Sequence, residues 1–401
     1  MKYNMKRRLL NILIFLALSA FGPGMLGALS SCSRDGLSGS REYDAVVCID
    51  NGRDGTKAMN DSDIESIAIF AFSGDVLVGY VYENGLLQSG KRTFPMNLSD
   101  GGAIDFYVIA NPDRGFYHIV DGSGNELDLS GTDRTNPPAG ITPAYLESCS
   151  VQMADGYSAA GDWLVPMTNI PLRSGENRRF NLDGGAGKWT YVNIDVTRAV
   201  SKVRMLFIRN DDFNDFQYVI DNISLTRKVV SCPLLEGTPE QGTSYSATDI
   251  GESLFVRGGN DSNGYIDKTF HIGNDNSVPS DLYINQNLYD SFGEYYIFPN
   301  IFGGNNAGIP PSNTSSPDFY NATVITVNYR DLERIDTGFW PWEDDEYIYG
   351  NKVNNIYLPA IDRNICVTVW CVLGGDGIDR TFTYTVSDWD ETVEIDVPDF
   401  N

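Results

Sequence analysis

The chain has 401 residues, of which 54 are Asp or Glu and 29 are Lys or Arg, giving a formal net charge of −25 at pH 7. A surface this acidic repels nucleic acid and anionic lipid, so we expect neither as a partner. The 40 Gly, 22 Tyr and 20 Phe residues, without any long helical pattern, predict an all-β architecture. The length is sufficient for two ordinary domains.

The N-terminal segment predicts export. Basic residues are followed by an apolar run over residues 9–21 and then by small residues, which are the three parts of a secretory signal. The tetrad Leu29-Ser30-Ser31-Cys32 resembles the lipobox of bacterial lipoproteins, in which the cysteine takes a diacylglycerol and the preceding segment, here residues 1–31, is cut off. The resemblance implies a protein anchored to a membrane through lipid on Cys32. The alternative is an ordinary signal peptide that has Cys32 near its end by chance.

Strand patterns follow one another through the first half of the chain. The predicted strands are residues 43–50, 64–72, 75–82, 103–110, 189–196, 201–208 and 216–226. Asn111-Pro112 ends the strand before it, because proline cannot donate to a strand ladder. The Gly- and Pro-rich stretch that follows, residues 112–162, reads as an elaborated loop region with one short helix near Pro143–Ser148.

The composition loosens over residues 232–264, where Gly, Ser, Thr, Pro and Glu dominate, and we place a domain boundary near residue 233. The strands predicted beyond it are residues 293–299, 322–327, 355–358, 364–373 and 381–386. In the closing segment, residues 392–400, the side chains of Val393, Ile395 and Val397 share one face. A terminal strand of this kind needs a partner edge.

The cysteines give no readable disulfide framework. Cys32 is accompanied by Cys48, Cys149, Cys232, Cys366 and Cys371, so five remain if Cys32 carries lipid. Cys366 and Cys371 lie five positions apart in one predicted strand and therefore point to opposite faces. Small buried residues are the favoured reading for most of the five, although disulfides are compatible with export.

Several short motifs, taken in order, resemble one known family, the fimbrillins of the type V pilus superfamily. The first motif is the lipobox at Cys32, and the last is a late tryptophan in Ser387-Asp388-Trp389. Between them lie Thr56-Lys57-Ala58, Asp63-Ile64-Glu65-Ser66-Ile67, Ala110-Asn111, Val165-Pro166-Met167-Thr168 and Arg198-Ala199-Val200-Ser201-Lys202-Val203. No single motif is specific, but together they cover most of the chain beyond Cys32. The Pro-Met-Thr and Arg-Ala-Val-Ser-Lys-Val elements carry most of the weight.

The resemblance implies two transthyretin-like β-sandwich domains in tandem, residues 58–232 and 233–401, preceded by a removable leader, residues 32–57, that contains the first strand. It implies a fimbrial subunit that is exported as a lipoprotein precursor, located at the outer membrane and cell surface, and active in adhesion. A trypsin-like protease would remove the first strand, and a strand of a neighbouring fimbrial subunit would fill the groove. Residues 392–400 are either that donated strand or an ordinary edge strand.

The predicted cleavage site is Lys57, with Arg53 second, because both lie in a Gly-, Asn- and Asp-rich segment of the kind that proteases cut. The family usually has arginine in the Thr-basic-Ala step, where this chain has Lys57. An arginine-specific protease would therefore have to use Arg53 or leave the chain uncut. An uncut chain would stay attached through Cys32, which suits an anchor or terminal component.

We expect no catalytic residue, no cofactor and no metal. His118 and His271 are the only histidines, they are far apart in sequence, and no known nucleophile, phosphate-loop or zinc motif occurs. A carboxylate pair suited to glycoside hydrolysis stays open, since acidic residues are abundant throughout. Residues 261–267 resemble part of a calcium loop but lack its later glutamate.

A second functional class is a surface lipoprotein that binds host glycans or proteins, either as a tip adhesin or as a pilus anchor. Trp340 and Trp342 flank Pro341 in an aromatic, acidic stretch and are the candidate ligand contacts, because sugar rings stack on indole faces. The competing interpretation is a loop whose aromatic side chains pack against a sandwich.

Overall fold

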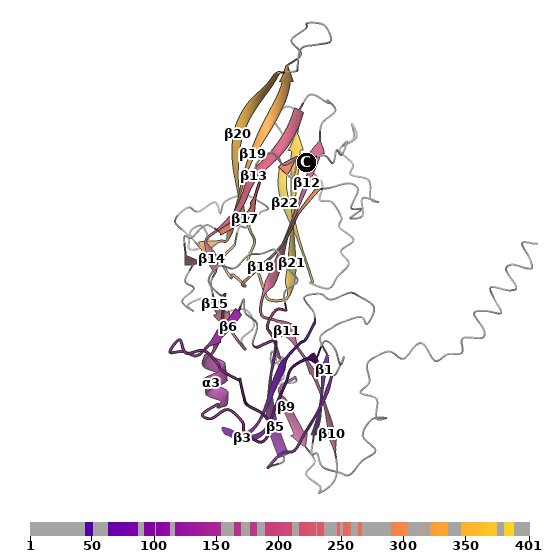
Figure 1. Cartoon of the computed structure of the whole chain (residues 1–401), viewed down its shortest axis with the longest axis vertical. Helices are drawn as coiled ribbons and strands as arrows, with labels where there is room; N and C mark the ends of the chain where they lie inside the picture. Colours follow the sequence, from indigo (N-terminus) through magenta and orange to yellow (C-terminus); the bar gives the residue numbers. More distant parts are fainter. Residues whose placement is uncertain are drawn as a thin grey trace, which may run out of the picture.

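The computed structural model is almost entirely built of β-strands (Figure 1), which confirms the all-β prediction. It describes residues 45–50, 63–86, 92–100, 102–112, 117–153, 164–169, 177–182, 189–210, 216–229, 231–235, 247–248, 252–257, 264–266, 290–303, 315, 321–335, 346–374 and 381–388. Within these residues, no helix has both the length and the apolar character needed to cross a membrane.

The N-terminal domain is built around a six-stranded sheet with the order β11-β8-β5-β2-β3, in which β9 also pairs with β5. Its strands are β2 (Ile67–Ser73), β3 (Val76–Glu83), β5 (Gly102–Ala110), β8 (Met167–Thr168), β9 (Arg179–Leu182) and β11 (Thr197–Arg198). Every side chain of β2 from Ile67 to Phe72 is fully buried. The sheet is therefore covered on both faces, which explains why β2 has a continuous rather than an alternating apolar sequence.

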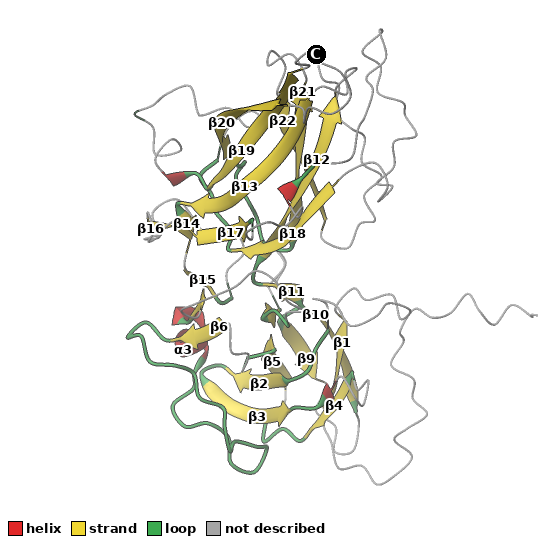
Figure 2. Ribbon diagram, turned by 45° about the horizontal axis from the view of Figure 1, so that its top comes forward, coloured by secondary structure: helices red, strands yellow, loops and turns green. Residues whose placement is uncertain are grey.

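Different layers cover the two faces of this sheet (Figure 2). One face meets a three-stranded sheet made of β10 (Thr190–Asp195), β1 (Ala45–Asp50) and β4 (Thr93–Met96). The approach is close at Gly79, where a Cβ would lie 2.4 Å from Cδ2 of Leu98, next to β4. The other face is tied to the helix α3 (Pro143–Ser148), which confirms the short helix predicted there, and Thr142 is its N-cap.

The C-terminal domain is a sandwich of two four-stranded sheets. One contains β18 (Asp290–Ile297), β12 (Ser201–Asn210), β21 (Ile365–Gly374) and β22 (Thr381–Asp388) in that order; the other contains β17 (Glu252–Val256), β13 (Phe216–Thr226), β19 (Val324–Ile335) and β20 (Glu346–Tyr357). Their facing side chains, such as Val203 and Val369 on one sheet and Ile223 and Val327 on the other, form a single core. The transthyretin-like character of the two domains stays a prediction.

The sheets group the strands differently from the boundary placed near residue 233. Strands β12 and β13 precede that residue, yet they pair with β21 and β19 of the second domain. The chain then returns to the first domain, where β15 (Ser231–Pro233) pairs with β7 (Ser150–Met153), and β7 in turn pairs with β6 (Tyr117–Val120). A second short pair joins β14 (Lys228–Val229) to β16 (Ala247–Thr248). Local composition shows where a strand lies in the sequence but not which sheet it joins.

The two motifs that carry most of the family resemblance meet where the domains join. Strand β8, from the Pro-Met-Thr element, pairs with β11, which begins the Arg-Ala-Val-Ser-Lys-Val element. Arg198 donates from Nη1 to Oδ1 of Asn364 at 2.6 Å, and the amide of Asn364 donates to the carbonyl of Val200 at 3.0 Å. Nη1 of Arg363 donates to the carbonyl of Leu234 at 2.9 Å. The junction is thus a network of hydrogen bonds rather than a bare linker.

Candidate functional site

Strand β1 lies in the middle of its sheet. It pairs in parallel with β10, where Val47 faces Val192, and antiparallel with β4, where Val47 faces Phe94. The strand predicted at residues 43–50 is thus inserted between two strands, so its removal would expose two hydrogen-bonding edges.

One face of β1 packs into the core of the domain. Ala45 and Val47 are fully buried and Ile49 is 6% exposed, and all three belong to the same apolar cluster as the groove walls. The wall residues are Phe94 and Met96 on β4 and Val192 and Ile194 on β10. Burial of each Val or Ile side chain contributes about 1.5–3 kcal/mol. Without β1, these walls would enclose an apolar groove open to water.

The hydrogen-bond pattern makes the two edges of β4 unequal. The amide of Ile49 donates to the carbonyl of Arg92 at 3.0 Å, which marks these residues as a hydrogen-bonded pair. Hydrogen-bonded and non-hydrogen-bonded pairs alternate along an antiparallel ladder, so Val47 and Phe94 form the next hydrogen-bonded pair. Pro95, opposite Val46, belongs to the non-hydrogen-bonded pair that follows Val47 and Phe94, and its nitrogen therefore faces the outer edge of β4. The edge toward β1 keeps its donors, whereas the outer edge lacks one.

Both predicted cleavage positions fall between β1 and the rest of the described domain. The described residues end at Asp50 and begin again at Asp63, and Arg53 and Lys57 lie between these two positions. A cut at either position would separate β1 from all later strands. Both basic residues lie outside the described residues, as do Cys32, Trp340, Trp342 and residues 392–400, so the predictions made for them stay predictions.

The chain beyond these positions is held independently of β1. Asn111, which is fully buried, accepts a hydrogen bond from the amide of Glu65 at 2.9 Å. Its side-chain nitrogen donates to the carbonyl of Asp63 at 2.9 Å and to that of Val165 at 3.0 Å. Asn111 has a φ of +53°, a conformation that asparagine tolerates better than most residues. These bonds fix the start of the segment leading to β2 from the far side of the predicted cut.

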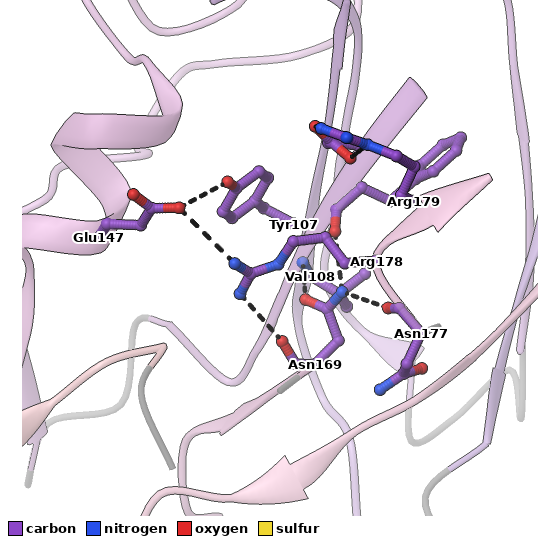
Figure 3. Close-up of polar contacts among 9 residues, drawn as sticks. Tyr107, Val108, Glu147, Asn169, Asn177, Arg178 and Arg179 are labelled. Atoms are coloured by element: carbon purple, nitrogen blue, oxygen red, sulfur yellow. Dashed lines mark hydrogen bonds and ion pairs between the residues drawn. The ribbon is translucent and has the colours of Figure 1, made fainter. Parts of the chain in front are cut away.

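A second polar cluster joins the helix α3 to the six-stranded sheet (Figure 3). Tyr107 on β5 donates to Glu147 on α3 at 2.9 Å, and the guanidinium of Arg178 lies 4.4 Å from the centre of the Tyr107 ring. Burial, reinforced by the hydrogen bond to Glu147, raises the pKa of Tyr107 to about 12. The phenol therefore stays protonated and acts as a donor. Arg178 also donates to the carbonyl of Asn169 at 3.5 Å, so the cluster links α3 to the sheet.

The described residues include His118 and four free cysteines. His118 contacts Glu126 at 2.6 Å, and His271 lies outside the described residues. The free thiols of Cys149, Cys232, Cys366 and Cys371 are buried, and burial raises the pKa of Cys149 and of Cys232 to about 11. The described part of the chain contains no group of three or more His, Cys, Asp or Glu side chains able to hold a metal ion.

Comparison with known proteins gives matches among solved structures only. No family model and no curated protein matches the chain. A putative cell adhesion protein from Parabacteroides distasonis matches with 12% identity and a TM-score of 0.48, over 86% of this chain and 96% of that one. The chain is similar to fimbrial proteins as well. They include the fimbrillin FimA of Porphyromonas gingivalis (11% identity, TM-score 0.45, 87% and 99% covered) and its tip fimbrial protein Mfa3 with a C-terminal truncation (14%, 0.43, 86% and 99%).

Sequence reasoning identified β1 and also β10, as residues 189–196, but it missed β4 and the pairing of β1 with both strands. Strand β4 has only four residues and contains Pro95, so its alternation of Phe94 and Met96 was too short to mark a strand. The parallel pairing with β10 joins residues about 145 positions apart, for example Val47 and Val192. No local pattern reports such a contact.

Proposed function

We propose that this protein is a structural subunit of a cell-surface fimbrium, exported as a precursor lipidated at Cys32 and polymerised by strand exchange after β1 is removed. The observation that carries the proposal is the position of β1. It is a buried central strand, it precedes every other described strand, and the basic residues Arg53 and Lys57 follow it closely.

Proteolysis supplies the irreversible step. While β1 remains attached, its effective concentration at the groove is high and no strand from another molecule competes well. A cut after Lys57, or after Arg53, turns β1 into a separate short peptide that dissociates. The groove walls then expose Phe94, Met96 and Ile194 to water, and both flanking edges lose their hydrogen-bond partners. A strand from a second subunit restores both kinds of interaction.

The occupant that the sequence offers is the C-terminal segment of a second copy. Val393, Ile395 and Val397 repeat at every second residue, as Ala45, Val47 and Ile49 do in β1. A strand with this spacing presents three apolar side chains to the core and leaves the intervening residues on the other face. Each subunit would then accept one strand and donate one, which gives an open, head-to-tail polymer.

The lipid on Cys32 belongs in this scheme to the leader, residues 32–57, and serves transport to the outer membrane. A chain that is cut loses the lipid together with β1 and enters the fibre. A chain that is not cut keeps both and stays attached as an anchor. The same sequence is therefore compatible with two positions in a fimbrium, and the state of Lys57 and Arg53 decides between them.

The test uses the exported chain with Cys32→Ala, so that it stays soluble without lipid. Limited digestion with a trypsin-like protease should release a peptide containing β1, and chromatography should then show a ladder of oligomers. The double variant Arg53→Ala, Lys57→Ala should stay monomeric under the same digestion. An excess of a synthetic peptide covering residues 43–50 should suppress the ladder, because it refills the groove.

The donor segment is tested separately with Ile395→Asp, which places a charge in the middle of the apolar repeat. We expect this variant to be cut normally but to stay monomeric. Val353→Asp on β20, where the valine is 61% exposed, is the matched control and should polymerise. A cut subunit that releases β1 and remains a monomer would refute strand exchange, whereas normal polymerisation of Ile395→Asp would refute only this choice of donor.

A further inference from the structure

A cavity of about 580 Å³ opens in the N-terminal domain between β6, the end of β3 and residues 126–130. Its lining includes the partly buried Tyr82, Tyr117, which is 2% exposed, and the polar residues Ser66, Asn84, Glu126 and Asp128. None of these residues belongs to β1, β4 or β10, so the cavity is separate from the proposed strand groove. Its volume falls within the range of small-molecule binding sites.

The hydroxyl of Ser66 is buried at this cavity without a hydrogen-bond partner. The residue is 1% exposed, and its Oγ makes no hydrogen bond in the structure. Its backbone is held in place, since its carbonyl accepts the amide of Asn111 at 2.8 Å. A buried polar group that is left unsatisfied costs free energy, and such groups are rare in folded proteins. A ligand hydroxyl in the cavity would satisfy it.

The carboxylate of Glu126 is positioned at the opening of the cavity. Glu126 forms an isolated antiparallel bridge with Val120, and the amide of Leu127 donates to the carbonyl of Ile119 at 2.7 Å. His118 lies beside the carboxylate, with Nδ1 2.6 Å from Oε1. One carboxylate oxygen is thus oriented by the imidazole, and the side chain is still 63% exposed. An oriented, accessible acceptor next to aromatic rings suits a ligand that carries hydroxyl groups.

We propose that this cavity binds a neutral saccharide. A sugar ring combines an apolar face, which packs on aromatic rings, with hydroxyl groups that pair with carboxylate, amide and serine oxygens. Glu126, Asp128 and the net charge of −25 disfavour an anion. The several neutral polar groups around the cavity match a ligand with many hydroxyls better than a single cationic group. This site lies apart from Trp340 and Trp342, the contacts predicted from the sequence.

The experiment measures binding of the methyl glycosides of glucose, galactose, mannose, fucose and N-acetylglucosamine to the uncut Cys32→Ala chain by saturation-transfer NMR. We expect at least one glycoside to bind. Ser66→Ala should weaken that binding about three- to tenfold, the value of one neutral hydrogen bond. It should not lower the melting temperature, because the hydroxyl has no partner within the described structure. Tyr82→Leu should weaken binding further, through loss of the aromatic ring.

Two controls decide the ligand class and the location. Ser73→Ala, at the end of β2, removes a hydroxyl that donates to Asp100. This variant should leave saccharide binding unchanged. Glu126→Gln keeps the hydrogen-bonding shape without the charge, so saccharide binding should fall only modestly. Absence of binding by all five glycosides, or equal binding by wild type, Ser66→Ala and Tyr82→Leu, would overturn the proposal. The proposal would also be overturned if methylammonium displaced the glycoside and if this binding of methylammonium were lost in Glu126→Gln.

Discussion

Strands β1 and β12 occupy equivalent places in the two domains. Each is flanked by one parallel and one antiparallel neighbour: β1 by β10 and β4, and β12 by β21 and β18. They differ in length, six residues against ten, and in their place in the chain. Strand β1 precedes all other described strands, whereas β12 follows β11 after two residues and leads on toward β13. One cut frees β1, but β12 would need two.

Side chains reinforce the difference. On β12, Lys202 Nζ lies 3.3 Å from Glu294 of β18, and Arg204 donates from Nε to the same carboxylate at 2.8 Å. Burial opposes ionisation of Glu294, but the two cations together hold its pKa below its usual range. Strand β1 has no such ion pair among its apolar residues up to Asp50, and its Cys48 is disulfide-bonded. The same strand arrangement thus suits a permanent element in one domain and a replaceable one in the other.

The largest expected effect comes from placing a charge at the inward position of each strand. Val47→Asp should destabilise the N-terminal domain by about 3–5 kcal/mol, because an unpaired carboxylate would lie in an apolar core. Val203→Asp on β12 should do the same to the second domain. Denaturant unfolding followed by hydrogen exchange would report which domain loses protection. Val353→Asp is the exposed control and should change stability by less than about 0.5 kcal/mol. Loss of both domains in Val47→Asp would show that they are not separate units.

Removing a hydrogen bond at the junction tests how strongly the two domains are coupled. Arg363, 7% exposed, donates to the carbonyl of Leu234, which also accepts a hydrogen bond from Thr168 at 3.0 Å. Arg363→Met keeps most of the apolar volume and should cost about 1.5–3 kcal/mol, the value of hydrogen bonds to a charged group. Calorimetry should show two overlapping transitions in the wild type that separate further in the variant. A single transition in both would mean that other contacts, such as the Tyr117–Phe298 ring pair, are sufficient.

Much of the fold could be predicted from local sequence, but the site could be predicted only in part. Alternation and turn residues located β1, β2, β3 and β5, and a short helix was predicted near Pro143–Ser148, where α3 lies. The neighbours of β1 were not predictable, because β10 lies far away in sequence and β4 is short. Likewise, nothing local to Asn111 indicates that its amide joins Asp63 to Val165. Pairings between distant segments depend on the whole core, and sequence patterns report only which face of a strand is apolar.

The buried thiol of Cys232 gives a smaller, pH-dependent effect on the stability of the N-terminal domain. Burial raises the pKa of Cys232 to about 11, so the folded protein keeps a proton that the unfolded chain begins to release near pH 9. The contribution to stability is complete below pH 9 and is lost as pH rises toward 11, by about 1–3 kcal/mol. Unfolding of Cys232→Ala at pH 8–10.5 should show a shallower decline than the wild type. Parallel curves would show that the thiol does not titrate in this way.

The smallest effect on stability is expected for Pro95→Val. This variant also tests directly whether the two edges of β4 differ as described. No other described strand pairs with the outer edge of β4, where the Pro95 nitrogen cannot donate. Valine would restore a donor there and favour strand geometry, at a cost or gain below about 1 kcal/mol for the monomer. An edge with a complete set of donors and acceptors is a template for pairing with another chain.

We therefore expect uncut Pro95→Val to form dimers by light scattering at concentrations where the uncut parent is a monomer. Pro137→Val, in an exposed loop, is the matched control and should stay monomeric. The peptide of residues 43–50 should not reverse this dimerisation, because β1 still fills the groove and the contact lies on the other side of β4. A monomeric Pro95→Val would mean that the outer edge is closed by something other than the proline. In that case the unequal edges of β4 would not explain why assembly waits for the removal of β1.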